Sequence, residues 1–159
     1  MCVIVHPFSQ GKEVGSLAEM ESGLSFEDWK GLREIHQRVA FLPFCEQITA
    51  YMEYWHWDPT DFLCETGLPR SRYSEIVHGR SETMQIENIM AICKALRLTK
   101  AWADDVFREA GRALSESQHE YFLYLLEVNP GWSLDESSGF LAEEGQPEFG
   151  GKPKQKARF

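Results

Sequence analysis

Apolar residues recur every three or four positions along most of the chain, which is the spacing of one face of a helix. The first such segment runs from Ser25 to Pro43, and Ser25 with Asp28 resembles a capping box at its start. A second segment begins at Pro43 and carries an apolar stripe through Trp55. The pattern predicts two consecutive amphipathic helices, preceded by loop or weak structure over residues 1–24.

Two short helices are predicted next, on either side of a turn at residues 66–69. Asp58 is a suitable N-cap for the first of them, and Gly67 supplies the left-handed conformation that ends it. The second covers Arg70–His78 and is followed by Gly79. A wider apolar pattern over Met84–Leu96 predicts a mostly buried helix, against which both short helices pack.

The C-terminal half predicts three further helices. They cover Lys100–Arg112, Ser117–Val128 and a segment that opens with a capping box at Ser133 and Glu136 and ends at Gly145. Because every segment with a clear period is helical, the expected fold class is all-α.

Charge is unevenly distributed over the 159 residues, whose formal net charge is −9. Such an acidic protein has little nonspecific affinity for nucleic acid unless its positive charge is locally concentrated. Residues 113–149 hold eight acidic residues and no Lys or Arg, whereas residues 150–159 hold four basic residues and no acid. This basic tail is expected to be disordered, and either adds attraction to phosphate or serves only as a solubilising terminus.

The chain carries no sign of secretion. Its four cysteines include no CxxC pair and are interpreted as reduced thiols. There is no signal-peptide pattern at the start and no run of 18 apolar residues. We therefore expect a cytoplasmic protein without a membrane partner.

The stretch from Asp58 to Leu98 resembles the helix-turn-helix of phage repressors and Cro proteins, the xenobiotic-response-element family. The resemblance is carried by Phe62, Gly67-Leu68, Tyr73, Ile76, Gly79 and the run from Ile89 to Leu96. It continues through AWADDVFREAGRALS and WSLDESSGFLAEEG, and so covers roughly residues 44–145. The resemblance implies a lambda-repressor-like helical bundle with an extra N-terminal helix and two C-terminal helices.

This resemblance divides the chain into four parts. Residues 1–24 form the N-terminal segment, and residues 25–112 form a helical domain with the helix-turn-helix at residues 58–79. Residues 113–149 are acidic helices that either pack on this domain or form a dimer contact, and residues 150–159 are the basic tail.

The resemblance also implies which residues would contact DNA. It places four residues of the second short helix in the major groove, where Arg can bond guanine and Glu can accept from cytosine. These base-reading candidates are Arg70, Ser71, Arg72 and Glu75. The candidates for backbone phosphate are Thr60, Arg80 and Ser81. Tyr73 and Ile76 are expected to point inward.

The motif departs from the family at two positions. Pro59 stands where the family usually has a phosphate-binding Gln, and Leu63 stands where a small residue is common. With few positive residues near the motif, a monomer should bind DNA weakly, so a homodimer is expected.

Other residue patterns favour structural roles over chemistry. The aromatic cluster at Tyr54–Trp57 is interpreted as core rather than a base-stacking surface. His119-Glu120 lacks the second His of a zinc-protease motif. Asp104-Asp105 fits a solvated face, or a salt bridge for one of the two, better than a metal site. We expect no enzyme activity, no metal and no cofactor.

The sequence thus predicts a DNA-binding transcriptional regulator, most simply a repressor from a mobile-element genome, that binds double-stranded DNA as a homodimer. The alternative is a protein-interaction module, such as an antitoxin-like or phage-encoded adaptor. It would keep the fold without strong DNA binding and would use the acidic region 113–149 to bind a protein partner.

Overall fold

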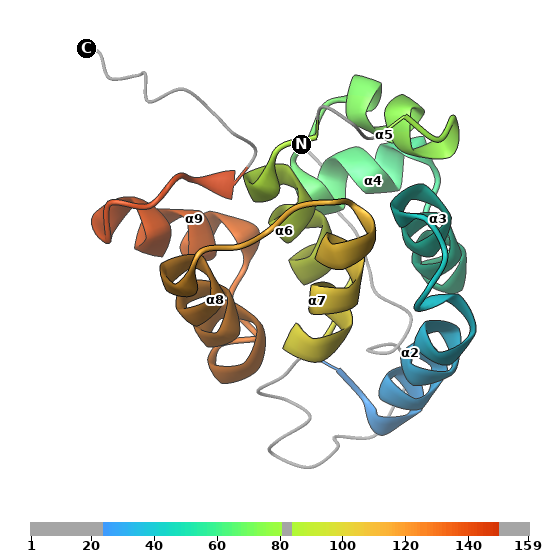
Figure 1. Ribbon diagram of the computed structural model, residues 1–159, viewed down its shortest axis with the longest axis horizontal. Helices are drawn as coiled ribbons and strands as arrows, with labels where there is room; N and C mark the ends of the chain where they lie inside the picture. The colour runs from blue at the N-terminus through green and yellow to red at the C-terminus, as the bar shows by residue number, and fades with distance from the viewer. Residues whose placement is uncertain (1–23, 81–83, 150–159) are drawn as a thin grey trace.

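The computed structural model describes residues 24–80 and 84–149, and these residues form helices and turns with no strand (Figure 1). The predicted all-α fold is therefore confirmed. In chain order the helices are α2 (Phe26–Val39), α3 (Phe44–Trp55), α4 (Pro59–Thr66), α5 (Arg70–Val77), α6 (Ile86–Ala95), α7 (Lys100–Glu109), α8 (Glu116–Leu123), the π-helical turn η2 (Tyr124–Val128) and α9 (Leu134–Glu143).

Helix α6 is the centre of the fold. Every residue from Asn88 to Lys94 is buried, so this helix has no solvent face along that stretch. It contacts α4, α7 and α9, and Figure 1 shows it in the middle of the other helices. The prediction that both short helices pack against this helix is confirmed for α4, whereas α5 packs mainly on α3 and α4.

Local capping determines where several of the surrounding helices begin or end. The Ser25 hydroxyl accepts from the backbone N–H of Asp28 at the start of α2, and Ser133 and Glu136 form the predicted capping box of α9. Helix α4 ends at Gly67, whose φ of 73° is left-handed and favours glycine. These boundaries agree with the sequence pattern because each depends on residues within one turn.

One predicted helix has a different ending. The helix expected over Ser117–Val128 is α-helical only to Leu123 and continues as the wider turn η2. The buried ammonium of Lys94 on α6 donates to the carbonyl of Leu125 at 2.8 Å and to that of Asn129 at 3.2 Å. These two bonds satisfy carbonyl groups at the end of η2 and tie the C-terminal region to α6.

Helices α2 and α3 approach closely at Gly31. A Cβ at this position would lie 2.5 Å from Cε1 of Tyr54 on α3. The Tyr54 ring is held in place because its hydroxyl donates to Oδ1 of Asp28 at 2.7 Å. Glycine at position 31 is therefore required by the contact between the two helices.

The cysteines are not all alike. Cys45 and Cys93 are free and buried, as expected, but Cys64 is disulfide-bonded, so the prediction of a reduced thiol is wrong at this position.

None of the helices in the described ranges has the length and apolar character that crossing a membrane requires. The expected character of residues 1–23 and of the tail 150–159 lies outside the described residues.

Gly31→Ala should destabilise the protein by about 1–3 kcal/mol, because the added methyl group overlaps the Tyr54 ring. Chemical denaturation measures this change in the free energy of unfolding. Gly139→Ala is the matched control, since it lies in α9 with no atom within 4 Å of the added Cβ. The control should be neutral or stabilising by up to about 1 kcal/mol, and equal losses in the two variants would contradict the proposed contact.

Lys94 should make the stability depend on pH. Burial, and then the neighbouring Arg97, lower its pKa from 10.5 to about 8 in the folded protein. Between these values the unfolded chain binds a proton that the folded chain has released, so the free energy of unfolding rises with pH. From pH 7 to pH 9, the stability of the unchanged protein relative to Lys94→Met should rise by about 1 kcal/mol. Denaturation of both proteins at each pH tests this, and a constant difference would contradict it.

Candidate nucleic-acid interface

Helices α4 and α5 form a helix-turn-helix whose inward face is apolar. Ile76 of α5 is buried, and the half-buried ring of Tyr73 meets Phe62 of α4 edge-on with 5.6 Å between centroids. The turn is held by Thr66, whose hydroxyl donates to the carbonyl of Phe62 and accepts from the N–H of Leu68. The predicted inward positions of Tyr73 and Ile76 are therefore confirmed, and the opposite face of α5 is left toward solvent.

The start of α5 is suited to a negatively charged partner. Arg70 and Ser71 are both exposed, and no side chain caps the helix N-terminus. The first turn also contains no acidic residue. Free N–H groups and the positive end of the helix dipole favour an anion at such a position.

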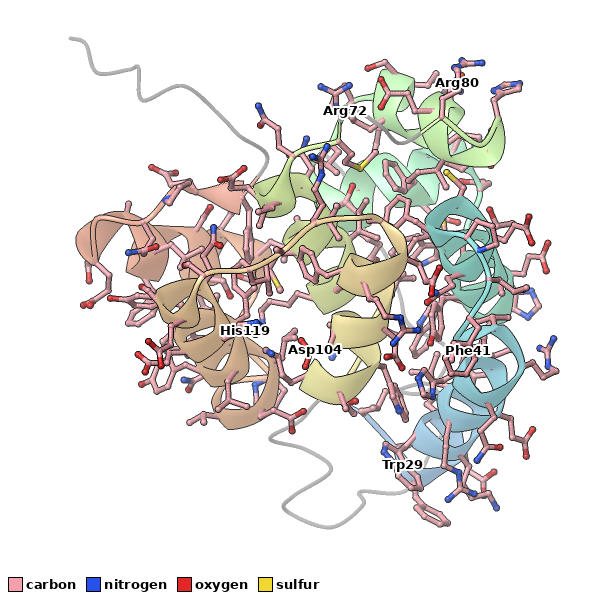
Figure 2. The ribbon with its side chains drawn as sticks, viewed as in Figure 1. Trp29, Phe41, Arg72, Arg80, Asp104 and His119 are labelled. Atoms are coloured by element: carbon pink, nitrogen blue, oxygen red, sulfur yellow. The ribbon has the colours of Figure 1, made fainter. Side chains whose placement is uncertain are left out.

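Arg80 follows α5 and faces solvent at the same edge of the molecule. Figure 2 shows Arg72 and Arg80 at this edge, beyond the body of the helices. The backbone N–H of Arg80 donates to the carbonyl of Glu75 at 2.7 Å, which fixes the chain where it leaves α5. Ser81, the third phosphate candidate, lies outside the described residues.

Two of the base-reading candidates are bonded to each other. Nη1 of Arg72 donates to Oε2 of Glu75 at 2.8 Å, with side chains 31% and 22% exposed. The other carboxylate oxygen of Glu75 is buried without a hydrogen-bond partner among the described residues. An ion pair this exposed contributes at most about 1 kcal/mol, and it leaves the other N–H groups of Arg72 for a further acceptor such as a base edge.

The N-terminus of α4 carries two carboxylates at the place where the family resemblance implies a phosphate. Asp58 accepts from the N–H of Asp61 at 2.8 Å, and Asp61 accepts from the N–H of Asp58 at 3.0 Å. Thr60 is exposed beside them. A phosphate at this position would be repelled by the two carboxylates. It would also find the N–H groups of Asp58 and Asp61 already hydrogen-bonded. Sequence reasoning found Asp58 but missed Asp61, although the D-x-x-D spacing was a usable signal.

The aromatic cluster before α4 belongs to the core, as predicted. Trp55 is buried, and its indole N–H donates to the carbonyl of Leu96 at 3.0 Å. Trp57 is half-buried against the edge of Phe62. These rings are held by protein contacts and are not available to stack on bases.

The acidic and histidine residues of α7 and α8 form ion pairs. Nζ of Lys100 lies 2.7 Å from Asp104 and 2.9 Å from Nδ1 of His119, and Figure 2 shows Asp104 and His119 between the two helices. Asp105 pairs with Arg108 and with His36. Within the described ranges, no group of three His, Cys, Asp or Glu side chains is arranged to hold a metal ion. Asp104 and Asp105 both form salt bridges, whereas the sequence pattern favoured a salt bridge for only one of them.

Comparison with known proteins identifies the segment that holds this site. Residues 48–100 match the Cro/C1-type HTH DNA-binding domain. The matched segment begins within α3, includes α4 to α6 and ends at the first residue of α7. No curated protein and no solved structure matches the chain. The expected continuation of the resemblance to residue 145 lies beyond the match and stays a prediction.

Asp58→Ala should destabilise the protein by about 1 kcal/mol, because it leaves the N–H of Asp61 without its cap. Asp58→Ser removes the same charge but keeps a capping oxygen, so it should retain most of the stability. Thermal and chemical denaturation of both variants distinguish capping from charge. If serine cost as much as alanine, the carboxylate charge rather than the cap would be the stabilising feature.

Proposed function

Because residues 48–100 form a Cro/C1-type helix-turn-helix domain, we propose that this protein is a sequence-specific DNA-binding regulator that acts as a repressor. One observation carries the proposal. Helix α5 follows the tight turn of a matched domain, packs its apolar side inward and leaves Arg70 and Ser71 exposed at its uncapped start. In helix-turn-helix proteins this is the end of the recognition helix that contacts base edges.

Base reading is assigned to four residues of α5. The Arg70 guanidinium can donate to O6 and N7 of one guanine. The Ser71 hydroxyl can either donate a hydrogen bond to a base edge or accept one from it. Arg72 and Glu75 enter the groove as a bonded pair in which Glu75 orients Arg72. Glu75 can also accept from cytosine N4, so this pair suits a step that contains a guanine and a cytosine.

Phosphate contact is assigned to the start of α5, to Thr60 and to Arg80 with the adjacent Ser81. At the start of α4, the carboxylates of Asp58 and Asp61 repel the DNA phosphates and so weaken this contact. With so few positive contacts, each half-site binds weakly, and we propose that a homodimer reads two half-sites about one helical turn apart. The acidic helices beyond residue 113 then lie away from the duplex.

A second function is favoured by one specific observation. The capping box of Asp58 and Asp61 places negative charge where a DNA backbone would approach. This arrangement suits a protein-interaction module that retains the helix-turn-helix fold and binds a partner through its acidic surface. The acidic residues of region 113–149 add to that surface.

DNA binding by fluorescence anisotropy tests these alternatives. The duplexes carry the region upstream of the protein's own gene, or the same bases in shuffled order, at low salt. The unchanged protein should bind the upstream duplex at least tenfold more tightly. Arg70→Ala with Arg72→Ala should reduce that affinity by about a hundredfold or more, because two base contacts are lost.

The matched control is Arg33→Ala with Arg38→Ala. It removes the same charge from exposed positions of α2, which Figure 1 shows at the other end of the molecule from α5. This control should keep most of the selectivity. If the unchanged protein does not distinguish the two duplexes, the regulator proposal fails and the protein-interaction module is favoured.

A further inference from the structure

A cavity of about 400 Å³ lies between the start of α2, the turn from α6 to α7 and η2. Its size falls within the range of about 300–1,000 Å³ that is usual for small-molecule sites. Its walls are mainly apolar and include Phe26, Trp29, Leu98 and Leu126. No feature of the sequence pattern indicated this cavity, because its walls come from three separate segments.

Lys94 supplies a positive charge to the wall of this cavity. The residue is only 7% exposed, and its ammonium donates two hydrogens to the carbonyls of Leu125 and Asn129. An ammonium has three hydrogens, so one is left for a further acceptor. An ammonium surrounded by apolar groups gains more from a carboxylate than a solvated one does, because water no longer screens the pair.

The charges around Lys94 leave room for an anion. Arg97 also lines the cavity and lowers the Lys94 pKa, whereas Glu136 raises it. Glu127, an acidic residue of the wall, already accepts from the backbone N–H of Lys100 at 2.7 Å. Burial lowers the pKa of Arg97, and the carboxylates of Glu65 and Asp28 oppose this by raising it. The acid that raises the Lys94 pKa is Glu136. The anionic group of a ligand is therefore placed at Lys94.

We propose that this cavity binds a small molecule with an apolar body and a single carboxylate. The carboxylate accepts from the Lys94 ammonium, and the apolar body packs against Trp29, Leu98 and Leu126. Thr99 provides a hydroxyl at the same wall. The proposal concerns a surface separate from α5 and does not rest on DNA binding.

Isothermal titration calorimetry of the full chain tests the proposal with 4-phenylbutyrate and its uncharged amide at pH 7. The two probes have the same apolar body and differ in charge. The carboxylate should bind at least tenfold more tightly than the amide. Absence of binding at millimolar phenylbutyrate, or equal binding of the two probes, would overturn the proposal.

Three variants locate the site. Lys94→Met should reduce the affinity for phenylbutyrate to that for the amide, whereas Lys100→Met, the same change at a salt-bridged lysine outside the cavity, should leave it unchanged. Phe26→Ala, at an exposed wall residue, should weaken both probes by a similar factor. Equal effects of the two lysine variants, or no effect of Phe26→Ala, would place binding elsewhere. If Lys94→Met does not fold, the ratio of the two probes and Phe26→Ala still decide the question.

Discussion

The burial of α6 on every side is the constraint on which the rest of the structure depends. Because the residues from Asn88 to Lys94 have no solvent face, other helices must cover them. Helix α4 packs on α6 from the helix-turn-helix, and α7 and α9 pack on it from the C-terminal half. The helix-turn-helix and the acidic helices are thus parts of one core, although they are far apart in the sequence.

Electrostatics then distinguish two neighbouring helix N-termini. Both α4 and α5 expose this end, but α4 is capped by the carboxylates of Asp58 and Asp61 whereas α5 has no side-chain cap and begins with Arg70. The first arrangement stabilises the helix by satisfying its own N–H groups. The absence of a side-chain cap on α5 leaves the N–H groups at its start available to a binding partner. Stability and binding are therefore divided between adjacent helices, and this division favours α5 over α4 as the anion-binding end.

Lys94 is the main polar exception within the scaffold. A buried ammonium is costly unless its hydrogens are bonded, and the carbonyls of η2 provide that compensation. The same bonds hold the π-helical turn in a defined position against α6, which shapes one wall of the neighbouring cavity. A single lysine thus links the packing of the C-terminal region to the place where we propose that a carboxylate binds.

The sequence by itself determined the all-α class, nearly every helix boundary and the location of the helix-turn-helix, because caps, glycine turns and apolar periods act within one or two turns of chain. The Arg72–Glu75 pair was not predicted, although its i, i+3 spacing on a helix permits it. Only the tertiary structure decided the role of Lys94, the change from α8 to η2, the close approach at Gly31 and the cavity. Each of these depends on residues distant in sequence, such as Lys94 and Leu125, that meet only when separate helices pack around α6.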